Sequence, residues 1–169
     1  MRIGLISDTH THLDPKVFEH FAECDEIWHA GDIGSGVLEP LQEFKPVRAV
    51  YGNIDDKIIR ASCPEHQRFE CEGLNIWMTH IGGYPPRYNP TMRPLLQQDP
   101  PDMFICGHSH ILKVMRDPKL NNLIFINPGA AGIHGFHQVK TIMRFDIEEK
   151  AVKNMQVIEL GKKGKIQQS

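Results

Sequence analysis

Histidine, aspartate and asparagine residues follow five short apolar runs of this sequence, at the points where the runs end. The chain of 169 residues has ten histidines. Imidazole nitrogens combined with carboxylate and amide oxygens suit borderline divalent ions, such as manganese, iron, zinc or cobalt, better than magnesium or calcium alone. The pattern predicts a metal site, and its candidate ligands are Asp8, His10, Asp32, Asn53, His80, His108 and His110.

Spacing strengthens this prediction at two places. Asp8 with His10, and His108 with His110, are each separated by one residue. In an extended segment, side chains at i and i+2 point to the same side, so each pair can direct two groups at one place.

Each block taken alone also has an ordinary structural explanation. An aspartate at a strand end commonly forms a turn or caps a helix, and the pairs Gly31–Asp32 and Gly52–Asn53 are common in turns. His80 after an apolar run is also typical of a buried core histidine. The metal site is favoured because the blocks recur in order on successive strand ends.

The elements that must position these residues are short strands and helices. Six apolar runs have the length and the β-branched and aromatic content of buried strands. They span residues 3–7, 26–30, 47–51, 75–79, 103–106 and 123–126. Helical patterns over 15–24 and 37–44 separate the first three runs, and Asp14 and Pro15 are placed to begin the first helix. This alternation predicts an α/β protein, in which sites lie at the carboxyl ends of strands.

The C-terminal third is expected to form strands over 141–147 and 153–160, joined by a turn over 148–150. A mixed sheet follows, parallel first and antiparallel later. Residues 161–169 are expected to be a frayed tail. With 40% hydrophobic residues, a chain of this length favours one domain, 1–169.

Composition argues against several classes of partner. The net charge of -2 is too small to draw the chain onto nucleic acid or an anionic membrane. We see no signal peptide, and the apolar runs are too short to span a bilayer. The four scattered cysteines form no CxxC pair, so we expect reduced thiols and a cytoplasmic location.

Five motifs taken together point to a known family. The order SDTH, GD, GN, TH and GHSH, with INPGA over 126–130, resembles the calcineurin-like metallophosphoesterase superfamily, and in particular its minimal YfcE-like phosphodiesterase branch. This resemblance implies a four-layer α/β/β/α sandwich of mixed sheets. It also implies two divalent metal ions, with manganese favoured over iron, zinc, nickel or cobalt, and a small phosphate diester as substrate, hydrolysed by a hydroxide held between the metals.

The same resemblance divides the ligands into two sets that share Asp32. One metal would take Asp8, His10, Asp32 and His110. The other would take Asp32, Asn53, His80 and His108. Asp32, Asn53 and His80 would also take part in catalysis, and Asn53 would contact substrate.

One position departs from the pattern of the superfamily. Most members have histidine after the asparagine, where it is thought to protonate the leaving oxygen, but this chain has Ile54. Asp55 matches the minimal branch and is a candidate catalytic acid, or else a turn or helix cap. Without a strong acid, leaving groups of low pKa should be favoured.

Four loop residues are candidate substrate contacts, each of which is also explained as an ordinary loop residue. His12 lies two residues beyond His10, and His134 and His137 lie in the glycine-rich turn after INPGA. Arg87 lies in a proline-rich segment after His80.

A scaffold is the main alternative function, because a eukaryotic retromer subunit that resembles this fold is better known for binding proteins. Competent side chains at all seven ligand positions favour the enzyme. A nucleotide-binding Rossmann domain is not favoured, because no GxGxxG follows the first strand. The sequence leaves open the physiological substrate, the native metal and whether copies of the chain form a homo-oligomer.

Overall fold

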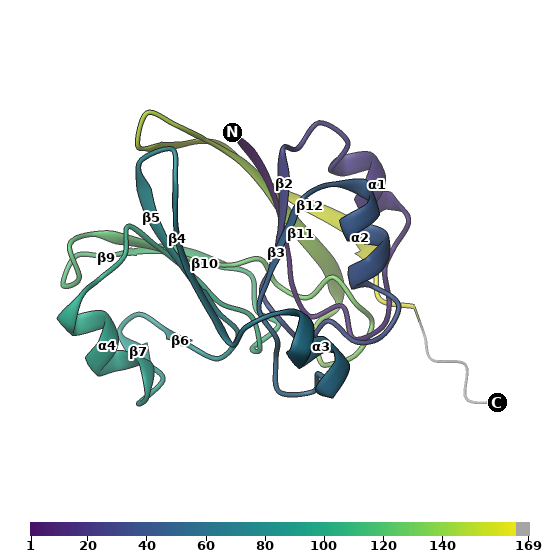
Figure 1. Cartoon of the computed structure of the whole chain (residues 1–169), viewed down its shortest axis with the longest axis horizontal. Coiled ribbons are helices and arrows are strands. Elements are labelled where there is room, and N and C mark those ends of the chain that lie inside the picture. The colour runs from purple at the N-terminus through teal and green to yellow at the C-terminus, as the bar shows by residue number, and fades with distance from the viewer. Residues whose placement is uncertain (165–169) are drawn as a thin grey trace.

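A computed structural model describes residues 1–164 of the chain, and two five-stranded sheets dominate it (Figure 1). The first sheet has the order β12-β11-β1-β2-β3 and the second β4-β5-β8-β10-β9. The strands of the first are β1 (Arg2–Ile6), β2 (Glu26–His29), β3 (Val47–Ala49), β11 (Val139–Glu148) and β12 (Ala151–Lys162). Those of the second are β4 (His66–Cys71), β5 (Leu74–Thr79), β8 (Met103–Ile105), β9 (Lys113–Asp117) and β10 (Leu123–Asn127). A small hairpin joins β6 (Gly83–Tyr84) to β7 (Arg87–Tyr88).

Helices cover the outer face of each sheet. They are α1 (Lys16–His20), α2 (Leu38–Phe44), α3 (Lys57–Ser62) and α4 (Met92–Gln98). Figure 1 shows α1 and α2 against the first sheet, and α4 on the far side of the second. Three apolar clusters fill the gaps: one between the sheets around Trp28 and Met103, one under α1 and α2 around Phe21 and Leu41, and one under α4 around Leu96. The four-layer α/β/β/α sandwich is therefore confirmed.

Parallel pairing brings the site-bearing loops together. Strands β1, β2 and β3 pair in parallel, as do β5, β8 and β10. The carboxyl ends of the two parallel groups meet, because the His80 ring of the second sheet contacts the Ala30 carbonyl of the first at 2.7 Å. The antiparallel strands lie at or towards the sheet edges: β11 and β12 in the first, β4 and β9 in the second.

Several predicted elements need correction. Edge strands β4 and β9 were not predicted, because their burial alternates along the strand and no continuous apolar run marks them. The expected order of parallel before antiparallel strands is also wrong, since β4 and β5 form an early antiparallel pair. Strand β10 joins β8 in the second sheet, whereas β11 returns to the first.

The ends of elements differ from expectation in smaller ways. Helix α1 is shorter than the predicted 15–24, although the Asp14 carboxylate accepts the Lys16 N–H at its start, as expected. Strand β12 includes Gly161 and Lys162, which were expected to belong to a frayed tail, and residues 165–169 lie outside the described residues. The turn between β11 and β12 is confirmed.

The four cysteines are buried and unpaired, which agrees with the expected free thiols. In the described part of the chain, no helix combines the length and apolar content needed to cross a bilayer.

Candidate metal centre

Five loops place the predicted ligands in one cluster. They follow β1, β2, β3, β5 and β8, and they bring six of the seven residues into two compact groups. One group is Asp8, His10 and His110, and the other is Asp32, His80 and His108. Within each group the candidate ligand atoms lie within 4.8 Å of one another, which is the spacing that a shared cation requires.

One carboxylate oxygen connects the two groups. Asp32 Oδ2 lies 3.3 Å from His10 Nε2 in the first group and 3.1 Å from His80 Nε2 in the second. Asn53 joins the second group, because its Oδ1 lies 3.0 Å from His108 Nδ1. The residues of the two groups are those that the resemblance assigned to two metals, and Asp32 Oδ2 lies between the groups.

Buried polar atoms in this cluster lack hydrogen bonds. Asp8 Oδ1, His10 Nε2 and His80 Nε2 are buried and make none, although ligand atoms of the other group lie nearby. Buried polar atoms in native proteins nearly always have a partner. Since each of these atoms is a good ligand for a borderline divalent ion, the residues present fit a metal centre.

The loop backbone is unusual at the ligands. Asp8, His10, Asp32, His108 and His110 all have φ between 44° and 73°, in the left-handed region. Non-glycine residues adopt this conformation rarely and at a cost. The sequence argument assumed extended pairs at 8–10 and 108–110, and this assumption is wrong: the side chains converge through tight left-handed turns. Hydrogen bonds between loops hold the turns, including Asp8 N–H to Gly31 O at 3.0 Å.

Glycines of the motifs make room for ligands on neighbouring loops. A Cβ on Gly52 would lie 2.1 Å from Asp32 Oδ1, and one on Gly107 would lie 2.2 Å from Ser7 Oγ. Neither gap could hold a side chain. The glycines of GN and GHSH are therefore explained by close approach of loops, beyond their preference for turns.

Hydrogen bonds to the atoms of His80 and Asp8 that face away from the cluster orient these two candidate ligands. The His80 Nδ1–H donates to Ala30 O at 2.7 Å, which leaves Nε2 facing the cluster. Asp8 Oδ2 accepts the Ser7 hydroxyl at 2.6 Å and the His108 N–H at 3.2 Å, which leaves Oδ1 free.

Charge in the cluster shifts two pKa values in opposite directions. Although burial disfavours its charged form, the imidazoles of His10 and His80 hold the pKa of Asp32 well below its ordinary value. Burial also opposes the charged form of His80, but the carboxylates of Asp32 and Asp8 raise the pKa of its imidazole. The cluster thus already stabilises positive charge at the place where a cation would bind.

His29 is a site-supporting residue that the sequence argument missed. It is fully buried, and its Nδ1 accepts the Gly31 N–H at 3.1 Å while its Nε2–H donates to Thr9 Oγ1 at 3.0 Å. Thr9 in turn donates to Ile33 O at 2.7 Å. Burial lowers the pKa of His29 to about 4, so the ring is neutral at neutral pH and links the first two ligand loops. Its only sequence signal is a polar residue at the end of an apolar run.

Asp55, a candidate catalytic acid in the sequence, binds backbone N–H groups in the structure. Its carboxylate is buried and accepts the backbone N–H groups of Ile33, Gly34 and Gly52 at 2.8–3.1 Å. It does not cap α3 either, because the Asp56 carboxylate accepts the Ile59 N–H there. The candidate acid is corrected to an anchor that ties two ligand loops together.

Two hollows flank the cluster and share Asn53. We call the first the histidine hollow, of about 560 Å³, and the second the arginine hollow, of about 440 Å³. The histidine hollow is lined by His10, Asp32, Asn53, Ile54, His108, Ser109, His110, Ile111, His134, Gly135, Phe136 and His137. The arginine hollow is lined by Tyr51, Gly52, Asn53, Arg60, Glu65, His66, Thr79, His80, Ile81, Asn89, Thr91 and Met92.

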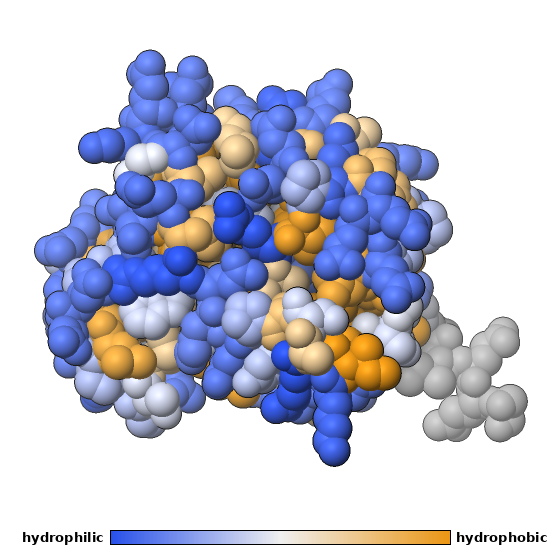
Figure 2. All heavy atoms as spheres, viewed as in Figure 1, coloured by the Kyte–Doolittle hydropathy of each residue, from blue (hydrophilic) through white to orange (hydrophobic). Residues whose placement is uncertain are grey.

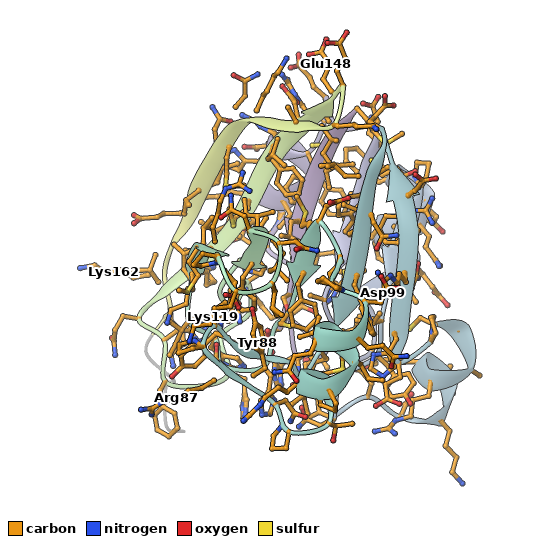
Figure 3. The ribbon with its side chains drawn as sticks, turned by 90° about the vertical axis from the view of Figure 1, so that its left-hand side faces the viewer. Arg87, Tyr88, Asp99, Lys119, Glu148 and Lys162 are labelled. Atoms are coloured by element: carbon orange, nitrogen blue, oxygen red, sulfur yellow. The ribbon has the colours of Figure 1, made fainter. Side chains whose placement is uncertain are left out.

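Two of the four candidate substrate contacts line a hollow. The His134 ring stacks on His10 with centroids 4.7 Å apart, and His137 contacts Gly132 O through Nε2 at 2.7 Å. His12 and Arg87 line neither hollow. Figure 3 shows Arg87 at the periphery of the molecule beside the buried Tyr88. His12 and Arg87 are therefore corrected to residues outside the site.

The protein is a sandwich of two mixed sheets, and imidazoles and carboxylates converge from the strand ends of both sheets. This combination defines a class of metal-binding α/β proteins. Residues 1–150 match the model of the calcineurin-like phosphoesterase superfamily domain. The chain belongs to this superfamily, and the resemblance read from its motifs is confirmed.

Individual proteins support the same assignment. A probable metallophosphoesterase of Methanothermobacter thermautotrophicus is 32% identical over 136 residues, which are 77% of each chain. A solved archaeal phosphodiesterase has a TM-score of 0.77 at 23% identity, over 95% of this chain and all of that one. Vps29 of Entamoeba histolytica in complex with Zn²⁺ has a TM-score of 0.70 at 19% identity, over 94% of this chain and 99% of that one. At these identities the two solved structures show a shared fold.

Proposed function

We propose that the protein is a two-metal phosphodiesterase. The observation that carries this proposal is the position of Asp32 Oδ2 between His10 and His80, where one oxygen faces both ligand groups. A pair of divalent ions supplies Lewis acidity and an activated water for attack on phosphorus. Asp8, His10 and His110 would hold one ion, and His80, His108 and Asn53 the other, with Asp32 shared.

The charge of the ligand set suits a phosphate substrate. Asp8 and Asp32 are the only carboxylates in the two ligand groups. The neutral amide of Asn53 adds no further negative charge, so a loaded centre would keep a positive excess that attracts a phosphate oxygen. A carboxylate at position 53 would reduce this excess and with it the Lewis acidity of the centre.

Two hollows support a diester rather than a monoester. A diester has two organic substituents on phosphorus, and there is space on both sides of Asn53. The arginine hollow also offers Arg60, whose Nε–H donates to Asp55 O at 2.7 Å. The guanidinium also donates through Nη2 to Asn53 O at 3.4 Å and lies 4.6 Å from the centroid of the Tyr51 ring. Arg60 has no carboxylate within ion-pair distance among residues 1–164, so its charge is not neutralised by a partner.

Among the residues that the structure describes, the site lacks an evident acid that would protonate the leaving group. Ile54 lines the histidine hollow where many relatives would place histidine, and Asp55 is occupied by backbone N–H groups. We therefore expect diesters with acidic leaving groups to react fastest. The ring of His134 stacks on His10 at the same hollow, and within residues 1–164 no hydrogen bond orients it.

A scaffold role is the alternative suggested by the fold that the chain shares with Vps29. Metal binding alone does not separate the two functions, because that Vps29 structure holds Zn²⁺. The left-handed backbone of five ligand residues serves metal binding, which both functions share. The two hollows beside the cluster favour the enzyme, because they offer space for a substrate next to the candidate metal ligands.

Turnover by metal-stripped protein tests the proposal. Manganese, nickel, zinc, cobalt and magnesium would be added singly, with bis(4-nitrophenyl) phosphate and 4-nitrophenyl phosphate as diester and monoester. We expect manganese to restore diester hydrolysis, chelator to abolish it and Asp32→Asn to abolish it. Asp99→Asn, a change of the same charge at an exposed residue, is the matched control. Turnover by stripped protein, or none with any metal, would contradict the proposal.

A further inference from the structure

Three large apolar side chains line the histidine hollow although water covers much of them. Their exposed fractions are 46% for Ile54, 59% for Ile111 and 100% for Phe136. Each adjoins a residue of the site in sequence: Ile54 follows Asn53, Ile111 follows His110, and Phe136 precedes His137. Single exposed apolar residues are ordinary, but three gathered at one concave site mark a surface that a ligand covers.

These side chains contribute nothing to the folded core. None belongs to the three apolar clusters that hold the layers of the described chain together. Figure 2 shows hydrophobic residues reaching the surface around α3, at the lower right of that view. Stability therefore does not explain their size, whereas binding does.

The floor and the wall of the histidine hollow differ in chemistry. His10, Asp32, His108 and His110, which are candidate metal ligands, form a polar floor, and the apolar residues lie beside it. A ligand that matches both has an anionic head and an apolar arm. The arginine hollow, with Arg60, Glu65 and His66, offers polar contacts instead.

We infer that the histidine hollow selects phosphate diesters with a flat apolar arm, which lies against Ile111 and Phe136 while the phosphate lies on the ligand cluster. This inference rests on the proposed function and specifies its substrate class. Phe136 offers a ring face, and Ile111 offers a branched surface, so an aromatic arm gains contact with both.

Two substrates with a common leaving group test the inference. Benzyl 4-nitrophenyl phosphate and methyl 4-nitrophenyl phosphate both release 4-nitrophenolate, so the ratio of their kcat/KM values reports the second arm alone. Because contact covers one aromatic ring and its wall, wild type should prefer the benzyl ester by about tenfold, which corresponds to about 1.4 kcal/mol. Phe136→Ala and Ile111→Ala should each reduce this ratio to about threefold or less.

Val157→Ala is the matched control, because Val157 is 46% exposed on β12 and lines neither hollow. It should leave both rates unchanged. Equal kcat/KM for the two esters in wild type would overturn the inference, and so would a preference that both variants retain, since the arm would then bind elsewhere. Failure to hydrolyse either ester with any metal would instead contradict the proposed function.

Discussion

Replacement of Asp55 by asparagine separates an anchoring carboxylate from a catalytic one. In the structure Oδ1 accepts the N–H groups of Ile33 at 3.0 Å and Gly34 at 2.9 Å, and Oδ2 accepts that of Gly52 at 2.8 Å. An amide has one acceptor oxygen where the carboxylate has two. Whichever way the asparagine turns, its NH₂ group faces at least one buried N–H donor.

The loss of stability can be worked from these contacts. One buried N–H without an acceptor costs about 1–3 kcal/mol, and loss of the charge weakens the remaining hydrogen bonds by about 1 kcal/mol in all. The free energy of unfolding of Asp55→Asn should therefore fall by about 2–4 kcal/mol. This is a large part of the 5–15 kcal/mol that is typical of a folded domain.

Urea unfolding of metal-free protein measures this loss. Asp56→Asn is the matched control, since it makes the same charge change at the next residue and asparagine also caps helices well. The control should change stability by less than about 0.5 kcal/mol. An Asp55→Asn protein of unchanged stability, with hydrolysis that depends more steeply on leaving-group pKa, would refute the anchor and make Asp55 the acid.

Three further predictions concern other residues. In metal-free protein, His29 should bind a proton near pH 6.5 when unfolded but only near pH 4 in the native state. The free energy of unfolding should therefore fall by about 3 kcal/mol as the pH falls from 6.5 to 4, because only the unfolded state gains the proton in this range. Urea titrations at each pH should show a weaker dependence in His29→Gln, and an equal one would contradict the buried neutral ring. Asp32→Ala should lose more bound metal than Asn53→Ala, and equal contents by elemental analysis would exclude the shared ligand. Ile54→His should flatten the dependence of rate on leaving-group pKa across substituted aryl diesters, and an unchanged slope would show that position 54 does not face the leaving oxygen.

The predictions that depend only on residues adjacent in sequence were the accurate ones. Apolar runs such as 3–7 and 103–106 predicted buried strands because a parallel strand covered on both faces must be apolar along its length. Asp14 and Pro15 marked the start of α1 for the same local reason. The polar residue after each run then lay at a strand end, where sites of α/β proteins form.

The edge strands β4 and β9 were not predicted because their hydrophobic pattern is weak in the sequence. In β4 and β9 only alternate side chains are buried, and polar residues fill the other positions. The allocation of strands to sheets was equally hidden: β10 and β11 follow one another in the chain, but β10 pairs with β8 and β11 with β1. Pairing depends on contacts between distant segments, which no window of the sequence contains.

The sequence by itself determined the identity of the seven candidate ligands, since each is fixed by a short motif at the end of an apolar run. Tertiary structure decided how they meet. It placed Asp32 Oδ2 between His10 and His80, and it gave Asp55 to the backbone of two loops. These roles depend on hydrogen bonds that join residues 21 to 100 positions apart in the chain. Residues of the same type stay indistinguishable until the fold sets what each one faces.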